Sequence, residues 1–166
     1  DSSAIDFAID GEGAGEELDL ESSDDDPEAT TLSLDEDDNT EVMVFAFDLS
    51  AEDSDGDVTL NEITLTATVT NPGTTADDLD DLVNDVRIEI GGDSFDAEAY
   101  TGATTTSLVF DIDGDATIAA DEKTTVMVYV DFENMDDSSY EGSTIILGVN
   151  ASAVEAEGAD SGEDIT

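Results

Sequence analysis

Carboxylates at alternating positions occur in two segments that share one pattern. Asp53-Ser-Asp-Gly-Asp-Val-Thr-Leu60 and Asp111-Ile-Asp-Gly-Asp-Ala-Thr-Ile118 both follow D-x-D-G-D-x-T-[LI], and each lies between two apolar stretches. Alternating carboxylates on a tight turn converge on one hard cation, and Ca²⁺ prefers such oxygen ligands. Both segments are therefore candidate calcium loops.

The second segment has the fuller set of ligands. At positions 1, 3, 5, 7 and 12 of a calcium-binding loop it places Asp111, Asp113, Asp115, the Thr117 carbonyl and Glu122. Ala116 replaces the glycine that EF-hand loops have at position 6, and no flanking helices are predicted. We expect Ile118 to Val130 to form a hairpin, which would carry Glu122 away from the other ligands.

The first segment is the weaker match. It offers Asp53, Asp55, Asp57, the Thr59 carbonyl and Asn61, but Thr64 stands where the closing carboxylate belongs. Both segments also fit a solvated acidic β-turn, because 47 of the 166 residues are Asp or Glu. Calcium is thus one of two interpretations of these loops.

Catalysis has little support in the sequence. The chain has no His and no Cys, which removes the commonest general base, thiol nucleophiles and the usual zinc ligands. Paired carboxylates serve glycosidases, but in so acidic a chain such pairs arise by chance. We find no G-x-S-x-G motif or phosphate-binding glycine loop, so we expect no enzymatic activity and no catalytic residues.

Two further motifs bear on surface chemistry. Asn150-Ala-Ser152 is an N-glycosylation sequon. Three tyrosines fit either a sugar-stacking platform or positions in the core and at its rim: Tyr100, Tyr129 and Tyr140.

The net charge limits the possible partners. Two basic residues against 47 acidic ones give 2 − 47 = −45. Arg87 and Lys123 alone cannot neutralise a track of phosphates, and adsorption to an anionic membrane is disfavoured. No apolar run approaches the ~20 residues that span a bilayer. We therefore expect no nucleic-acid binding and no membrane insertion, and infer a salt-adapted source with inorganic cations as partners.

The apolar residues recur with a period of two, which predicts half-buried strands. Met43, Phe45, Phe47 and Leu49 share one face in 41–50, as do the four residues Val126, Val128, Val130 and Phe132 in 124–132. Further strands are predicted at 3–9, 29–34, 57–70, 84–90, 94–100, 105–111 and 143–154, with one short helical stretch at 75–83.

The predicted fold class is all-β, an antiparallel two-layer β-sandwich that is immunoglobulin-like or jelly-roll-like. We place an acidic N-terminal arm with one or two extra strands at 1–40, the sandwich at 41–154, and an acidic tail or linker at 155–166.

Residues 41 to 152 resemble the immunoglobulin-like repeats of prokaryotic surface-layer and filament proteins. The resemblance lies in EVMVFAFDLSA, DVTLNEITLTATV, VRIEIGG and TIAADEKTTVMVYVDF, and the acid enrichment is similar to that of halophilic archaea. It implies an exported cell-surface protein that assembles into lattices or fibres and holds calcium at domain edges. The long apolar N-terminal helix of archaeal flagellins and type IV pilins is absent.

Two function classes follow. The first is a structural subunit of an extracellular surface layer or filament, which pairs strands with copies of itself. Its N-terminal arm carries a short apolar strand with Ala4, Ile5, Phe7 and Ile9. The alternative is an adhesin or carbohydrate-binding module of a larger surface protein.

Folding should depend on salt, because the Debye length is about 10 Å at 0.1 M salt and about 3 Å at 1 M. Dialysis from molar salt into low-salt chelator should abolish the β-sheet circular dichroism. An unchanged spectrum would contradict this prediction.

Overall fold

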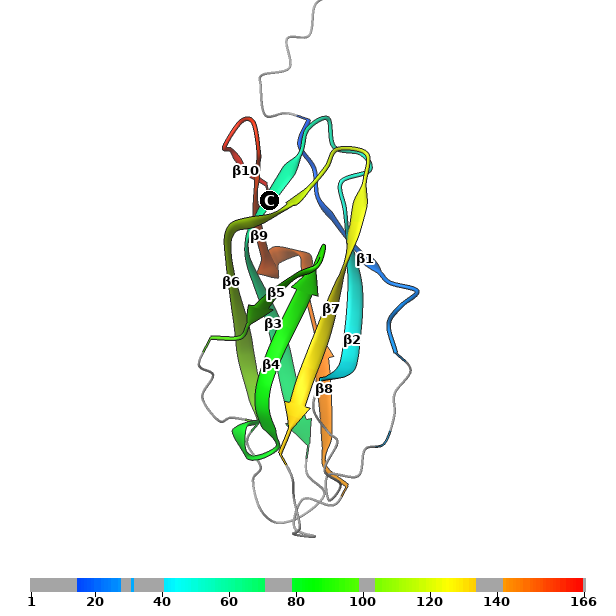
Figure 1. The fold of residues 1–166 in the computed structure, drawn as a ribbon, viewed down its shortest axis with the longest axis vertical. Helices are drawn as coiled ribbons and strands as arrows, with labels where there is room; N and C mark the ends of the chain where they lie inside the picture. The colour runs from blue at the N-terminus through cyan, green and yellow to red at the C-terminus, as the bar shows by residue number, and fades with distance from the viewer. Residues whose placement is uncertain are drawn as a thin grey trace, which may run out of the picture.

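The structure is a computed structural model that describes residues 15–27, 31, 41–70, 79–98, 104–133 and 142–165. It confirms the all-β prediction: two antiparallel sheets pack face to face as a β-sandwich, with their strands along the long axis (Figure 1). None of the described segments forms a helix long and apolar enough to cross a membrane.

The first sheet has five strands in the order β1-β2-β7-β4-β5. Their bounds are Asp19–Ser22 for β1, Val42–Ser50 for β2, Lys123–Phe132 for β7, Val83–Ile90 for β4 and Asp93–Asp96 for β5.

The second sheet is built around β3, Val58–Thr70, which pairs from Val58 to Thr68 with β6, Thr105–Ile118. On its other side β3 pairs with two strands in turn, β9 at Val154–Gly158 and β8 at Thr144–Gly148. β10, Asp164–Ile165, lies outside β9.

The predicted alternation produces the core between the sheets. Phe47, Leu49, Val126, Val128 and Val130 are buried there, together with Phe110, Leu60, Ile63 and Leu65 of the second sheet. The first residues of the predicted β2 face, Met43 and Phe45, are only half-buried. β1 covers β2 only from Phe47 to Ser50, and the β2–β7 register shifts between Met43 and Phe45.

The hairpin expected at Ile118 to Val130 is wrong. β6 belongs to the second sheet and β7 to the first, so residues 119–122 cross from one sheet to the other. Consecutive strands of a sandwich often change sheets, and the local period of two does not distinguish this from a hairpin.

The C-terminal segment also differs from expectation, since 155–165 forms β9 and β10 rather than a tail. Ala156 is buried in the core, whereas Glu155 is exposed. Short strands with so many acidic residues resemble a linker in sequence. Of the predicted arm, β1 supplies one extra strand. The strand predicted at 3–9 and, apart from residue 31, the strand predicted at 29–34 lie outside the described residues.

Two other predicted elements are shorter than expected. The strand predicted at 94–100 is β5, after which the Ala97 amide bonds the Val86 carbonyl of the first sheet and the Glu98 amide bonds the Val109 carbonyl of the second. This segment thus closes one side of the sandwich. Within the described part of the predicted 75–83 helical stretch there is only the 3₁₀ turn η1, Leu79–Asp81.

Both basic residues form ion pairs on the first sheet. Arg87 of β4 bonds Glu41 at 2.9 Å and Glu89 at 3.2 Å. Lys123 of β7 lies 3.0 Å from Asp48 and 3.9 Å from Glu21. Asp48 is only 5 % exposed, so its charge requires these partners.

The pKa of Asp48 is lowered from its ordinary value of 3.8. Burial acts to raise this pKa, but hydrogen bonds from Thr125, Lys123 and Ser23 and the charge of Lys123 outweigh burial. Asp48 therefore stabilises the fold above pH 3.8, and this contribution is lost as the pH falls below that value.

Thr125→Val should lower the free energy of unfolding by about 1 kcal/mol at pH 7, because Thr125 Oγ1 donates to Asp48 Oδ1 at 2.8 Å. The deficit should begin to shrink below pH 3.8, where the unfolded chain takes up a proton at Asp48, because the pKa of the folded carboxylate is lower. Urea unfolding in molar salt at pH 7 and pH 3 measures both values. Thr66→Val, at an exposed threonine of β3, is the control, and an equal deficit there would contradict the prediction.

Candidate cation-binding loops

The first acidic segment forms the connection from β2 to β3 and is tied down by its neighbours. Ser54 is buried; its hydroxyl donates to the Gly56 carbonyl at 2.7 Å and accepts from the Glu17 amide at 3.2 Å. The Asp55 amide donates to the Gly15 carbonyl. Asp57 Oδ1 accepts from the Ala120 amide at 2.9 Å, so this carboxylate already holds the crossing loop 119–122.

The second acidic segment lies within β6, where it interrupts the pairing with β3 as a bulge of four residues. In the pairing with β3, Leu60 lies opposite Ala116 and Glu62 opposite Asp111, so residues 112–115 together oppose Asn61. Asp113 and Gly114 adopt φ of 48° and 81°, the left-handed region that Gly and Asp tolerate best. Ile112 is buried and anchors the bulge in the core.

The two segments run side by side in opposite directions. Thr59 pairs with Thr117, the residue at the same position of the other segment, and the pairing between the two segments covers 58–60 and 116–118. This arrangement places the acidic groups at opposite ends of the paired stretch. Asn61 consequently lies beside the bulge of the second segment, about 13 Å along β3 from Asp57.

Glu122 does not join the acids of the second segment. Its carbonyl accepts from the Ala51 amide at 2.8 Å, and the Asp121 amide donates to the Ala51 carbonyl at 3.0 Å. Ala51 lies two residues before the first segment, so Glu122 lies at that end of the sandwich, whereas Asp111 pairs with Glu62 in the second sheet.

The sequence therefore has the residue spacing of a calcium loop, but the fold separates Glu122 from the other predicted ligands. Within the described residues, no three His, Cys, Asp or Glu side chains are grouped so that they could hold a metal ion. Calcium binding at these segments stays a prediction.

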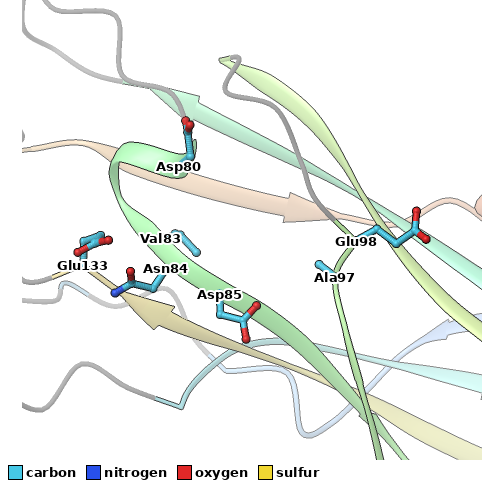
Figure 2. Close-up of a pocket in the computed structure, with 7 residues that line it drawn as sticks. All are labelled: Asp80, Val83, Asn84, Asp85, Ala97, Glu98 and Glu133. Carbon is cyan, nitrogen blue, oxygen red and sulfur yellow. The ribbon is translucent and has the colours of Figure 1, made fainter.

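Two surface hollows are also acidic. One of about 380 Å³ lies between η1, the start of β4 and the end of β7. Figure 2 shows its carboxylates, which come from separate elements and do not converge: Asp80, Asp85, Glu98 and Glu133.

The second hollow, of about 970 Å³, lies between the β1–β2 edge and the β9–β10 edge. Apolar and acidic side chains line it together, including Leu18, Leu20, Ile165, Glu16 and Glu155.

The predicted glycosylation sequon and the three tyrosines lie on different parts of the chain. Asn150 and Ser152 are exposed where β8 ends and the 3₁₀ turn η3, Ala151–Ala153, begins, so the sequon is accessible. The Arg87 guanidinium lies 4.7 Å above the centre of the Tyr129 ring and occupies a face that a sugar would need. Tyr100 and Tyr140 lie outside the described residues.

Sequence reasoning missed the buried carboxylate of Asp48, which lies on the outer face of β2. Its alternation with Phe47 and Leu49 indicates an exposed residue. Its burial depends on hydrogen-bond partners far away in the sequence, Ser23 and Thr125, and no local pattern marks it.

Comparison with protein-family models, with curated proteins and with solved structures finds no match.

If Asp111, Asp113 and Asp115 bind calcium, millimolar Ca²⁺ should raise Tm above the value in NaCl of equal ionic strength. Asp113→Ala should remove most of that increment. Glu122→Ala should retain it, because Glu122 lies beside Ala51. Thermal melts of the three proteins test this, and an identical response in Asp113→Ala would assign the effect to general screening.

Proposed function

We propose that the chain is a non-enzymatic structural subunit of an extracellular surface layer or filament from a salt-adapted microbe. In this role it assembles with copies of itself through strand pairing and cation bridging. The observation that carries the proposal is that both basic residues of the chain form ion pairs with carboxylates of the first sheet and its flanking residues. The rest of the charged surface is acidic.

Such a surface limits how copies can associate. Complementary charge cannot bring two surfaces of equal sign together. The forces that remain are backbone pairing at strand edges, burial of apolar side chains and cations shared between carboxylates. A β-sandwich with open edges supplies the first two, and the acidic loops supply the third.

Carbohydrate binding has less support. Sugar sites commonly use an open aromatic face, but no aromatic side chain lines either hollow, and Tyr129 is covered by Arg87. An adhesin or carbohydrate-binding module is therefore the alternative function that the experiment below distinguishes from a structural subunit.

The N-terminal arm is the proposed connector between subunits. Gly15 is fixed beside Asp55 at one end of the sandwich, and residues 1–10 precede it with apolar residues at Ile5, Phe7 and Ile9. This alternation predicts a strand with one apolar face, which the edge of a neighbouring subunit can accept.

Deletion of residues 1–10 should leave a folded domain that no longer polymerises. Negative-stain images in molar salt report the polymers, and circular dichroism reports the fold. In the full-length chain, Ile5→Asp with Phe7→Asp should have the same effect. Asp6→Asn with Asp10→Asn, which changes the other face of the strand, should not.

Polymers that persist after the deletion would show that the arm is not the connector. A full-length chain that stays monomeric in molar salt and is retained on a glycan surface would favour the adhesin and contradict the structural role.

A further inference from the structure

β8 is an unprotected edge strand. It pairs with β3 on one side, and within the described chain no strand covers its other side. Ile146 at its centre is 64 % exposed and is the one large hydrophobic side chain that is exposed among the residues described. Natural proteins protect exposed edges with charged residues, proline or bulges, and β8, with the sequence TIILG, has none of these.

The other described strands with an open edge all carry acid. β1 contains Asp19 and Glu21, β5 contains Asp93 and Asp96, and β10 contains Asp164. β6 contains Asp111, Asp113 and Asp115, and Glu98 partly caps its edge. The absence of charge on β8 is therefore specific to this edge.

The backbone groups that β8 presents to solvent follow from its pairing. The Val69 amide donates to the Thr104 carbonyl on the β6 side of β3. Because alternate residues of a strand point their peptide groups to opposite sides, Thr68 and Thr70 bond toward β8, where they lie opposite Ile146 and Thr144. The N–H and C=O groups of Ile145 and Leu147 therefore point outward.

The outer face of the second sheet beside β8 is also free of charge. We call this surface the neutral face. It comprises the outward residues of β3 and of the two strands that pair with it, β6 and β8. These residues are Thr64, Thr66, Thr68, Thr70, Thr105, Ser107, Val109, Thr144 and Ile146. The nearest acids that continue it along the strands are Glu62 and Asp111, which pair with each other.

We propose that β8 is a homotypic interface, in which β8 of a second copy pairs with it antiparallel about a two-fold axis at Ile146. Ile145 then lies opposite Leu147 of the second copy and exchanges both backbone hydrogen bonds with it, as the outward groups require. Ile146 faces Ile146 of the second copy at the non-hydrogen-bonded position, where paired side chains come closest. The second sheets of the two copies join into one.

A second copy of this chain is the partner that fits, for two reasons. The sequence TIILG maps onto itself in this register with an apolar or small residue at every inner position and no carboxylate opposite another. The chain's charge of −45 also makes the neutral face the surface where two copies approach at least electrostatic cost.

This interface goes beyond the proposed function, because it uses no residue of the arm and produces a closed pair rather than a polymer. The two proposals can therefore fail separately.

Ile146→Cys tests the interface directly, because the chain has no other cysteine and the two sulfur atoms would face each other across the axis. In molar salt under mild oxidation it should form disulfide-linked dimers at least tenfold faster than Thr66→Cys or Ser94→Cys. Thr66 is exposed on the neutral face but lies in central strand β3, and Ser94 lies on the acidic edge strand β5. Equal rates for the three variants would overturn the proposal.

Ile146→Glu gives an independent reading. In the full-length chain whose arm is blocked by Ile5→Asp with Phe7→Asp, it should leave the circular dichroism unchanged because the side chain of Ile146 is already exposed. Sedimentation of this chain in molar salt should show monomers in place of dimers. Thr66→Glu adds the same charge and should stay dimeric. If the arm-blocked chain with Ile146 intact is itself monomeric at the same concentration, the interface is refuted.

The chain that lacks residues 1–10 distinguishes the two proposals. If β8 pairs with β8, Ile146→Cys crosslinks equally well without the arm, whether or not polymers form. Loss of crosslinking on deletion would instead assign this edge to the arm and overturn the homotypic interface.

Discussion

Repulsion among 47 carboxylates is the constraint on which the rest of this structure depends. A core must form without bringing those charges together, and the sandwich achieves this by giving each strand one apolar face and placing acids on the other or in the connections. Asp48 is the exception, since it is buried on the outer face of β2. It is also the carboxylate that receives Lys123 and the Thr125 hydroxyl.

The same constraint explains why β3 is central. It is a long strand with threonine at alternate outward positions from Thr64 to Thr70, and it holds β6 on one side and β8 and β9 on the other. Threonine favours strands without adding charge. Acidic residues lie near the other end of β3. There the bulge of β6 places the second acidic segment opposite Asn61, and the first segment closes the end of the sandwich.

Local pattern predicted much of this fold, because the period of two identifies half-buried strands directly. It identified β2, β3, β4 and β7 and the core residues Val126 to Val130. It could not assign strands to sheets, because that depends on pairing between distant residues. Glu122 shows the consequence: its spacing from Asp111 matches a calcium loop, yet a crossing between sheets separates them. Likewise, β9 and β10 are short strands whose acids resemble those of a tail.

The neutral face extends the electrostatic argument from folding to association. Salt that screens the chain enough to fold it also shortens the range over which two copies repel each other. What then limits their approach is the desolvation of carboxylates at the contact, and a contact made by threonines and an isoleucine avoids that cost. The chain is acidic at each other described open edge, so the threonine-rich end of the second sheet is where strand pairing between copies is least opposed. The predicted salt dependence of folding and the proposed pairing of β8 thus rest on the same screening, and the proposal confines pairing to the edge that carries no charge.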